Sequence, residues 1–395
     1  MNRNSLFFLL TLVALPFISF AQESVYKEFS AEVELEYRYF PNAGLYEGQE
    51  QSFLSIAAQP EFYMDWKGGK NIFKVSLFGR IDQHDQRRTH FDIRELYWQT
   101  VKGNAELTIG IKKVFWGVTE SAHLVDIINQ SDVIESFDNE KKLGQPMVHY
   151  SYLSSVGTFD FFVMPFYRKR VFPGTEGRLR TPVVLDGNEF PFESSMEEWR
   201  TDFAVRWSHY IGKFDFGISH FYGTGREPLI ASIEPFQPVY GIINQTGLDV
   251  QATTGPVLWK FEGIYNANSF KSFGAIATGF EYTFGNVNGK GLDIGLVGEY
   301  LYDSRRDLTL SSLQNDIFAG VRFGFNDIQD TQILAGTIID LDRTSKLYSI
   351  EASRRVGQSW GVELEGRFFQ DIQDNEFMYF FREDSFLRFA ITKYF

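Results

Sequence analysis

The chain has 395 residues, no cysteine, 17% aromatic residues and a formal net charge of −13. The lack of cysteine excludes disulfide scaffolds, thiolate metal sites and cysteine nucleophiles. The acidic balance argues against nucleic acid as a partner, because phosphate contacts need clustered Lys and Arg. The aromatic content is too high for a disordered chain. The length fits either several soluble domains or one large all-β unit.

The first 21 residues have the layout of a secretory signal peptide. Arg3 supplies the positive charge, Ser5 to Phe17 is mostly apolar, and Ser19-Phe20-Ala21 offers small residues for cleavage. An N-terminal membrane anchor is the alternative, but the apolar stretch is short for a spanning helix. We therefore expect residues 1–21 to be removed and residues 22–395 to form a single domain.

Beyond the signal peptide, the dominant pattern has a period of two. In the first such segment Val33, Leu35 and Tyr37 alternate with Glu34 and Glu36. Because successive side chains of a strand point to opposite faces, this segment has one apolar and one polar face. Many of these runs exceed the 5–6 residues usual in globular strands, and about 10 residues let a tilted strand cross a bilayer.

The alternation predicts 18 strands, with 16 as the alternative count. It weakens between Asp92 and Val101, where we expect a β-bulge. The tenth strand has the weakest pattern of the set. In chain order, the predicted strands begin near Glu28, Ser52, Asn71, Thr89, Asn104, Gln145, Thr158, Arg200, Lys213, Tyr240, Pro256, Ser272, Leu292, Asn315, Thr331, Leu347, Gly361 and Phe377.

The length of a connection between two strands depends on whether its number in chain order is even or odd. Every even-numbered connection is a short turn, and every long one is odd-numbered; the long ones are residues 115–144, 169–198, 223–238 and 304–314. An outer-membrane barrel with both termini in the periplasm needs short periplasmic turns and long external loops. The sequence therefore predicts an all-β fold, a transmembrane antiparallel up-and-down β-barrel in the outer membrane of the cell.

The polar strand faces would line a hydrated lumen. Acids and bases occur there together at a density that a packed core could not hold, and 16–18 strands leave room for an aqueous path. The acidic excess predicts a slight preference for cations. We therefore expect a porin-like channel for passive diffusion of small polar solutes, with outer-membrane lipid and lipopolysaccharide as its other partners.

The third external loop, residues 115–144, is rich in acids. Many porins fold their third loop into the lumen, where it faces a basic wall, and by this resemblance we expect the same here. The alternative is an ordinary solvated surface loop. The residues predicted to form the constriction are Arg38, Lys74, Arg80 and Arg94 on early strands and Glu120, Asp126, Asp132 and Glu135 on the loop.

The fourth external loop carries a group of basic residues. They could form a vestibule that attracts anionic solutes or lipopolysaccharide phosphates, or they could simply keep an exposed loop soluble; we favour the second interpretation. The residues are Arg168, Lys169, Arg170, Arg178 and Arg180.

A motif lies at the start of the third loop. The chain reads Gly110-Ile111-Lys112-Lys113-Val114-Phe115-Trp116-Gly117 and then Asp126-Ile127-Ile128-Asn129-Gln130-Ser131-Asp132. This resembles the G-x-[QK]-x-x-x-W-G … D-x-x-N-P-x-D pattern of a family of poorly characterised, porin-like Gram-negative outer-membrane proteins, with Gln130 in place of the usual Pro. The resemblance implies an outer-membrane barrel without assigning a substrate. Trp116 and Gly117 would anchor the start of the loop at the outer interface and turn it inward. Asp126 and Asn129 would cap or cross-link the folded loop, with ligand contact as the alternative.

The chain ends on Phe395, with Ile391 and Phe389 at even-numbered steps before it. This resembles the C-terminal targeting signal of bacterial outer-membrane proteins, although Lys393 stands where an aromatic residue is common. The resemblance implies recognition of Phe395 by the barrel-assembly machinery.

Acids and histidines gather around the second external loop, at Asp82, His84, Asp85, His90 and Asp92. Acid–His pairs at a barrel rim could activate water or bind a divalent cation. The chain has no HExxH or phosphate-binding signature, so we predict no catalytic residues, no metal and no cofactor. The alternative function is a non-conducting barrel that binds a ligand or hydrolyses a substrate at its rim.

Overall fold

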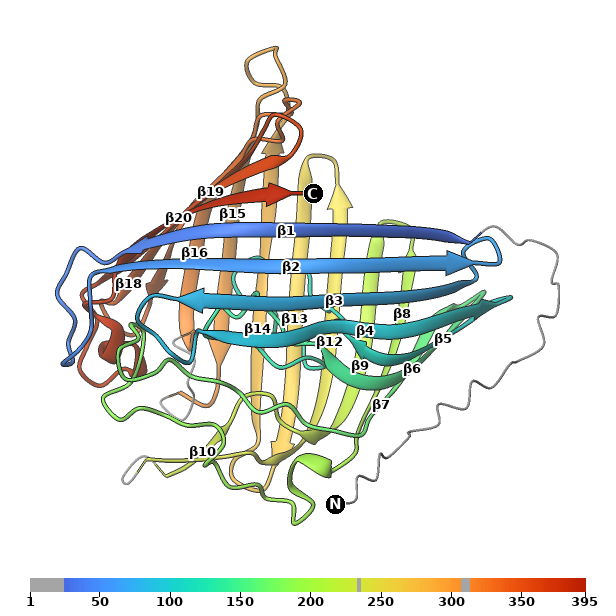
Figure 1. Ribbon diagram of the computed structural model, residues 1–395, viewed down its shortest axis with the longest axis horizontal. Coiled ribbons are helices and arrows are strands. Elements are labelled where there is room, and N and C mark those ends of the chain that lie inside the picture. The colour runs from blue at the N-terminus through green and yellow to red at the C-terminus, as the bar shows by residue number, and fades with distance from the viewer. Residues whose placement is uncertain (1–24, 233–235, 307–312) are drawn as a thin grey trace, which may run out of the picture.

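The computed structural model describes residues 25–232, 236–306 and 313–395. In these residues 18 strands form one antiparallel sheet. Pairing of β1 (Tyr26–Tyr39) with β20 (Phe386–Tyr394) closes the sheet into a barrel (Figure 1). The predicted all-β, up-and-down barrel of 18 strands is confirmed. The predicted signal peptide lies outside the described residues.

The remaining barrel strands follow one another around the wall. A separate hairpin and two short 3-10 helices, η1 (Glu197–Trp199) and η2 (Phe377–Phe381), lie in the loops. No helix of the described residues is long and apolar enough to cross a membrane. The strands are β2 (Ser52–Trp66), β3 (Asn71–Asp82), β4 (His90–Lys102), β5 (Ala105–Lys112), β6 (Gln145–Ser154), β7 (Gly157–Met164), β8 (Asp202–Ile211), β9 (Phe214–Thr224), β12 (Ile242–Thr254), β13 (Val257–Asn268), β14 (Phe273–Phe284), β15 (Asp293–Asp303), β16 (Asn315–Gly324), β17 (Gln332–Asp340), β18 (Lys346–Val356) and β19 (Trp360–Gln370), with β10 (Leu229–Ser232) and β11 (Gln237–Val239) in the hairpin.

All but one of the predicted strand starts lie within two residues of the observed starts. The prediction of a last strand near Phe377 is wrong, because β20 begins at Phe386. The apolar residues before it form η2, in which Met378 and Phe381 are buried against Phe369 of β19. Their apolar character therefore reflects packing inside a loop and not a lipid-facing strand.

The predicted β-bulge lies in β4. Ser76 of β3 pairs with Glu95, and the next residue, Leu77, pairs with Ile93, which leaves Arg94 as the extra residue. A bulge of this kind redirects side chains on the bulged strand. Here Arg94 and Glu95 both form ion pairs with inward-lying groups.

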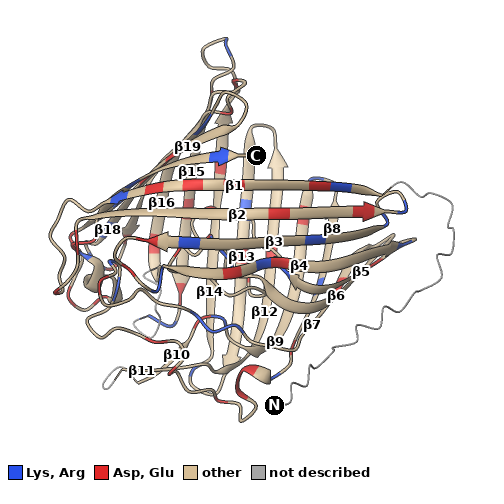
Figure 2. Ribbon diagram, viewed as in Figure 1, with Lys and Arg blue, Asp and Glu red and all other residues tan. Residues whose placement is uncertain are grey.

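The outward face of the barrel is apolar. On β1, Leu35 and Tyr37 are exposed, whereas Glu36 between them is buried. Acids and bases occur along the same strands (Figure 2). Exposed aromatic residues lie near both ends of the strands, as expected for the two interfacial girdles of an outer-membrane barrel. Examples are Tyr39, Phe91 and Tyr265 at one end and Tyr210, Trp259 and Phe284 at the other.

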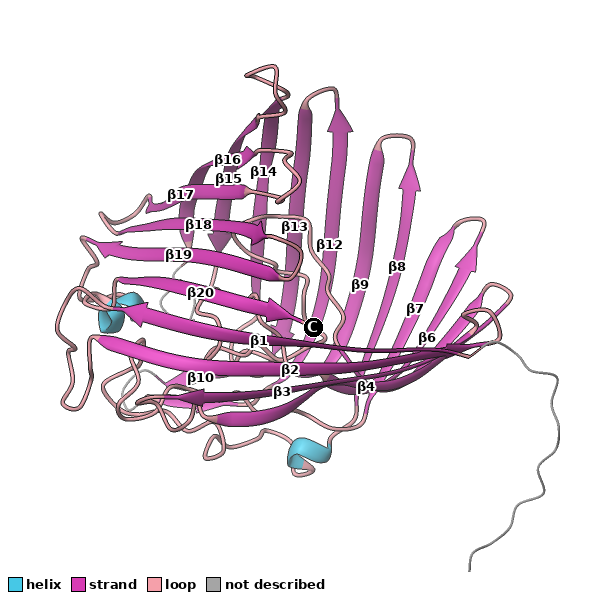
Figure 3. Ribbon diagram, turned by 45° about the horizontal axis from the view of Figure 1, so that its top comes forward, coloured by secondary structure: helices cyan, strands magenta, loops and turns pink. Residues whose placement is uncertain are grey.

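The two ends of the barrel differ in their connections (Figure 3). β1 begins and β20 ends at the end that carries the short turns. The opposite end carries the long loops, so the predicted asymmetry is present. The loops that matter below are loop 1 (40–51), loop 2 (83–89), loop 3 (113–144), loop 4 (165–201) and loop 9 (371–385).

Candidate functional site

Loop 3 lies across the inside of the barrel. Near its start, Glu120 forms ion pairs with Arg322 of β16 (2.6 Å) and Lys260 of β13 (3.5 Å). Near its end, Asp138 forms an ion pair with Arg367 of β19 (2.6 Å). The loop therefore contacts the wall at β13–β16 and again at β19.

Two wall carboxylates bind the backbone at the start of loop 3. Glu262 of β13 is fully buried and accepts hydrogen bonds from the N–H groups of Val118 (2.7 Å) and Thr119 (3.0 Å). Glu299 of β15 accepts from the N–H groups of Glu120 (2.7 Å) and Ser121 (2.8 Å). Alternation places both acids on the polar face of their strands, but it gives no signal for which lumen acids meet a loop.

The structure joins four of the eight predicted constriction residues in pairs between loop and wall. Arg80 of β3 contacts Glu135 (2.9 Å), and Arg94 of β4 contacts Asp132 (2.7 Å). All four side chains are buried. These are direct contacts, so no open space separates the acids from the bases on this side of the barrel.

The other two predicted wall bases bind acids of the strands. Lys74 forms an ion pair with Glu95 (2.8 Å), and Arg38 lies 3.5 Å from Glu36. Glu36 also forms ion pairs with Arg88 of loop 2 (2.8 Å) and Arg388 of β20 (2.7 Å). Arg88 was not among the predicted residues, although it donates to the carbonyl of Ile134 in loop 3 (3.0 Å). Its position in a loop gave no sign that it turns inward.

Burial and neighbouring charges shift the pKa values of the ionisable groups of loop 3 in different directions. Burial opposes ionisation of Glu135, but Arg88 and Arg80 outweigh it and lower the pKa of that carboxyl. For Asp126, burial outweighs the nearby Lys142 and raises the pKa. For His123, burial lowers the pKa, but hydrogen bonds and charges of Glu140 and Glu262 raise it to about 10.

Asn129 cross-links the two ends of loop 3. Its Oδ1 accepts a hydrogen bond from the N–H of Val114 (2.9 Å), and its Nδ2 donates to the carbonyls of Lys112 (3.0 Å) and Leu143 (2.8 Å). Asp126 accepts from the N–H of Trp116 (3.3 Å). These hydrogen bonds join residues in and beside loop 3 that are 10 to 17 residues apart in the sequence.

Trp116 does not lie at the outer interface, so that prediction is wrong. It is 6% exposed, packs against Phe162 of β7 (ring centroids 5.6 Å apart) and lies beneath the guanidinium of Arg206 (5.1 Å). Phe162 faces inward, so the Trp116 ring that packs against it lies inside the barrel. Gly117 follows with φ +141°, and a Cβ there would lie 2.9 Å from Nδ1 of His123. The turn therefore requires glycine.

The basic residues of loop 4 do not lie exposed in solvent, so the favoured interpretation of them is wrong. Arg168 forms an ion pair with Asp92 (2.6 Å), and Arg178 forms one with Asp384 of loop 9 (2.7 Å). Gln130, at the variant position of the motif, accepts from Nε of Arg170 (3.1 Å). Loop 4 therefore packs onto loops 3 and 9, and its arginines supply the contacts.

The acids of loop 2 are engaged in structural contacts. Asp82 forms an ion pair with Arg88 (2.9 Å), and Asp85 accepts from the N–H of Gly174 in loop 4 (3.1 Å). Nδ1 of His90 lies 3.0 Å from the carbonyl oxygen of Arg88. Within the described part of the chain, no group of three or more His, Cys, Asp or Glu side chains could hold a metal ion.

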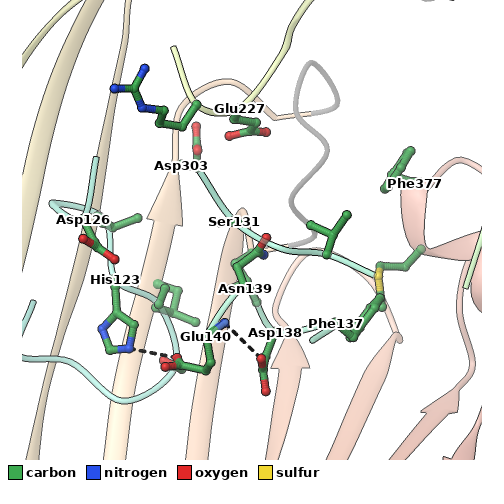
Figure 4. Close-up of a pocket in the computed structure, with 18 of the residues that line it drawn as sticks. His123, Asp126, Ser131, Phe137, Asp138, Asn139, Glu140, Glu227, Asp303 and Phe377 are labelled. Carbon is green, nitrogen blue, oxygen red and sulfur yellow. Dashed lines mark hydrogen bonds and ion pairs between the residues drawn. The ribbon is translucent and has the colours of Figure 1, made fainter. Parts of the chain in front are cut away.

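A cavity of about 650 Å³ lies between loop 3, loop 4 and the inward faces of the strands from β12 to β19. Figure 4 shows His123, Asp126, Phe137, Asp138 and Glu140 of loop 3 around it. Of the predicted constriction residues, Glu120 and Asp126 line this cavity, and the other six lie outside its lining. The open space is therefore on the opposite side of loop 3 from the Arg80 and Arg94 contacts.

The fold defines the class: a closed 18-stranded antiparallel β-barrel with an inward-folded third loop, similar in fold to solved outer-membrane porins. No protein-family model and no curated relative matches the chain.

Solved structures of similar fold have very different sequences. One is OccAB1 of Acinetobacter baumannii, with a TM-score of 0.57 at 7% identity over 93% of this chain and 96% of that one. Another is OccD3 (OpdP) of Pseudomonas aeruginosa, with a TM-score of 0.56 at 10% identity over 93% and 91%. A third is Wzi of Escherichia coli, described as a carbohydrate-binding β-barrel involved in group 1 capsule assembly, with a TM-score of 0.54 at 11% identity over 92% and 83%. The likeness concerns the fold.

Proposed function

We propose that this chain is an outer-membrane channel through which small hydrophilic solutes diffuse passively, and that it is not an enzyme. The solutes pass between loop 3 and the wall formed by β16, β17 and β18. The observation that carries this proposal is a row of small residues on that wall: Gly320 pairs with Gly336, which pairs with Ser349.

The row lies between the two places where loop 3 contacts the wall. Glu120 reaches Arg322 of β16 on one side, and Asp138 reaches Arg367 of β19 on the other. Between these contacts the loop spans strands whose two glycines carry no side chain, so the ring of Phe318 rests directly against their backbone and takes up less of the lumen. Loop and wall together therefore form an eyelet beside the cavity.

The same proposal includes the surroundings of the barrel. The apolar outward face suits lipid, and the long-loop end would meet lipopolysaccharide. Phe395 is 70% exposed beyond β20, and its N–H donates to the carbonyl of Ala31 (2.9 Å). An exposed terminal aromatic beside the closing pair of strands is accessible to the barrel-assembly machinery.

A non-conducting binding barrel is the second candidate. It is favoured by the contacts among loops 1, 3, 4 and 9, which cover part of the long-loop end. A barrel of similar fold, Wzi, is described as carbohydrate-binding. The hydrolytic form of this alternative has less support, since Asp82 and Asp85 are already held by Arg88 and by loop backbone.

Conductance of the refolded protein in planar bilayers separates the two candidates. A channel gives stable single-channel steps that scale with salt concentration, and the reversal potential in a salt gradient tests the expected slight cation preference. A protein that shows heat-modifiable mobility on gels, and is therefore a folded barrel, but gives no steps would contradict the channel and support the binding barrel.

A further inference from the structure

The cavity has an apolar side that diffusion of purely hydrophilic solutes does not require. Phe318 of β16, Ile338 of β17 and Leu347 of β18 pair in register on neighbouring strands and line the cavity. Phe369 of β19 continues the row and packs beneath loop 9. These side chains face inward, since they alternate with outward residues such as Ile339. We call Phe318, Ile338 and Leu347 the apolar row.

The glycines of the eyelet shape this apolar row. A Cβ on Gly336 would lie 2.4 Å from the ring of Phe318, and one on Gly320 would lie 2.8 Å from it. The ring therefore rests against the backbone of both glycines and leaves the space in front of it open. Ile338 and Leu347 beside it are only partly buried.

Aromatic residues of two loops face the same space. Phe137 of loop 3 and Phe377 of loop 9 line the cavity (Figure 4). Phe137 packs edge-on against Phe381 of loop 9, with ring centroids 5.8 Å apart. The cavity is thus bounded by apolar side chains from the wall and from both loops. Pockets of about 300–1,000 Å³ with such a lining are typical of sites for small organic molecules.

Each acid of the cavity lining lies within ion-pair distance of a base. For example, Asp126 contacts Lys142 (3.2 Å), and Glu140 contacts His123 (2.9 Å). The remaining acids of the lining each lie within ion-pair distance of a base as well. They are Glu120 with Arg322, Asp138 and Glu351 with Arg367, and Glu227 and Asp303 with Arg305.

Two arginines of loop 4 line the cavity without such a partner. Arg170 donates its Nε–H to Gln130 (3.1 Å), and Arg180 donates to the carbonyls of Thr175 (2.9 Å) and Thr181 (3.0 Å). Neither forms an ion pair with a carboxylate of the described residues. They are the charged side chains of the lining that have no ion-pair partner among the described residues, so the anionic group of a solute would be drawn to them.

We propose, resting on the channel function above, that the cavity binds an amphipathic anion during passage. The compact apolar body of such a solute packs on the apolar row, and its single anionic group lies toward Arg170 and Arg180. The two features are complementary, because the apolar surface gives affinity by burial and the guanidinium groups give orientation and charge selection. A solute that has only one of the two parts meets only one of these features and is bound more weakly.

The test uses 1-naphthalenesulfonate as the probe, added to single channels in planar bilayers. We expect reversible blocking events in the ionic current. Methanesulfonate, which has the charge without the apolar body, and 1-naphthol, which has the body without the charge, should block at least about tenfold more weakly. Equal blocking by methanesulfonate would overturn the proposal.

Two variants test the two parts of the site, each with a matched control. Ile338→Ser and Arg180→Gln should each raise the half-blocking concentration of the probe about tenfold. The controls are Leu258→Ser, an inward residue of β13 outside the cavity lining, and Arg382→Gln, a loop 9 base outside it. The half-blocking concentration of the probe should be the same for both control variants as for the unmodified protein. Loss of blocking in the controls alone would contradict the assignment.

The outcome for the channel and the outcome for the site can be told apart. Steady current with no blocking by the probe overturns the amphipathic-anion site and leaves the channel intact. Absence of current overturns the channel. In that case the site is tested by titrating the barrel in lipid nanodiscs into 1-naphthalenesulfonate and following the fluorescence of the probe. Empty nanodiscs are the control. If the barrel shows no saturable binding beyond that of the control, the proposed site is overturned.

Discussion

Arg178 of loop 4 and Asp384 of loop 9 form a 2.7 Å ion pair whose side chains are only 2% and 1% exposed. The same guanidinium donates to the carbonyls of Asn42 and Glu50 in loop 1, each at 3.2 Å. One arginine therefore joins three loops that are far apart in the sequence. The long-loop end of the barrel is held together on this side by a buried charge pair.

Removing Asp384 should open this end of the barrel. Asp384→Asn leaves the guanidinium of Arg178 buried without its charge partner, which costs about 3–5 kcal/mol for a pair of this kind. We expect larger or noisier single-channel steps and a lower temperature for the heat-induced shift in gel mobility. The exposed pair Arg306–Asp342 provides the control. Arg306→Gln should change neither measurement, because exposed ion pairs contribute little.

The eyelet should narrow when its glycine row is filled. Gly336→Ala places a methyl group where the ring of Phe318 now lies, so the ring must move toward the cavity. We expect lower single-channel conductance and a loss of stability of about 1–3 kcal/mol from overpacking. Gly324→Ala is the matched control, since the nearest atom to a Cβ there is 4.0 Å away. Unchanged conductance in Gly336→Ala would place the solute path elsewhere.

Stability should depend on pH through His123. The pKa of this imidazole is raised to about 10 by Glu140 and Glu262 in spite of burial, against about 6.5 in an unfolded chain. A raised pKa means that the contribution is complete below about pH 6.5 and is lost as pH rises toward about 10. His123→Gln should therefore lower the urea midpoint of unfolding at pH 6 and have little effect at pH 10.5.

A control for this experiment is His220→Gln, because His220 is an exposed residue of β9 that bonds Thr246. Its effect on the midpoint at pH 6 should be smaller than that of His123→Gln, because the His220 side chain is exposed. A His123→Gln effect that does not change with pH would show that the imidazole stabilises the loop by packing and not by its charge.

The barrel could be predicted because its strands obey a local rule. Residues such as Leu35 and Glu36 reveal their faces by alternation, and the parity of the connections needs only the strand positions. The loops obey no such rule. Arg178 sits in a basic stretch typical of a solvated loop, and its partner Asp384 lies in a distant loop that only closure of the barrel brings near. The burial of Trp116 against Phe162 likewise depends on where loop 3 folds.

The predicted constriction shows the same limit. Its acids and bases were identified by residue type, and Arg80–Glu135 and Arg94–Asp132 do meet. Whether such a pair faces across open water or is in direct contact depends on distances that the sequence does not contain. The wall that borders the cavity consists instead of glycine and apolar residues, and these residue types do not indicate a pore when they are read in the sequence alone.

Loop 3 should be released by a single substitution at Asn129. This side chain is fully buried and makes three hydrogen bonds that join the start and the end of the loop. Asn129→Ala leaves their backbone partners unsatisfied, at about 1–3 kcal/mol for each group that stays buried. We expect larger single-channel steps with frequent fluctuations, while Asn104→Ala in an exposed turn should leave the current unchanged.

Deleting residues 125–138 should raise the conductance further, because it removes the span of loop 3 between its contacts with Glu262 and Arg367. If both the deletion and Asn129→Ala conduct like the unmodified protein, loop 3 does not limit the current. The narrowest point would then lie between loop 4 and loop 9, where Asp384→Asn alone should increase the current.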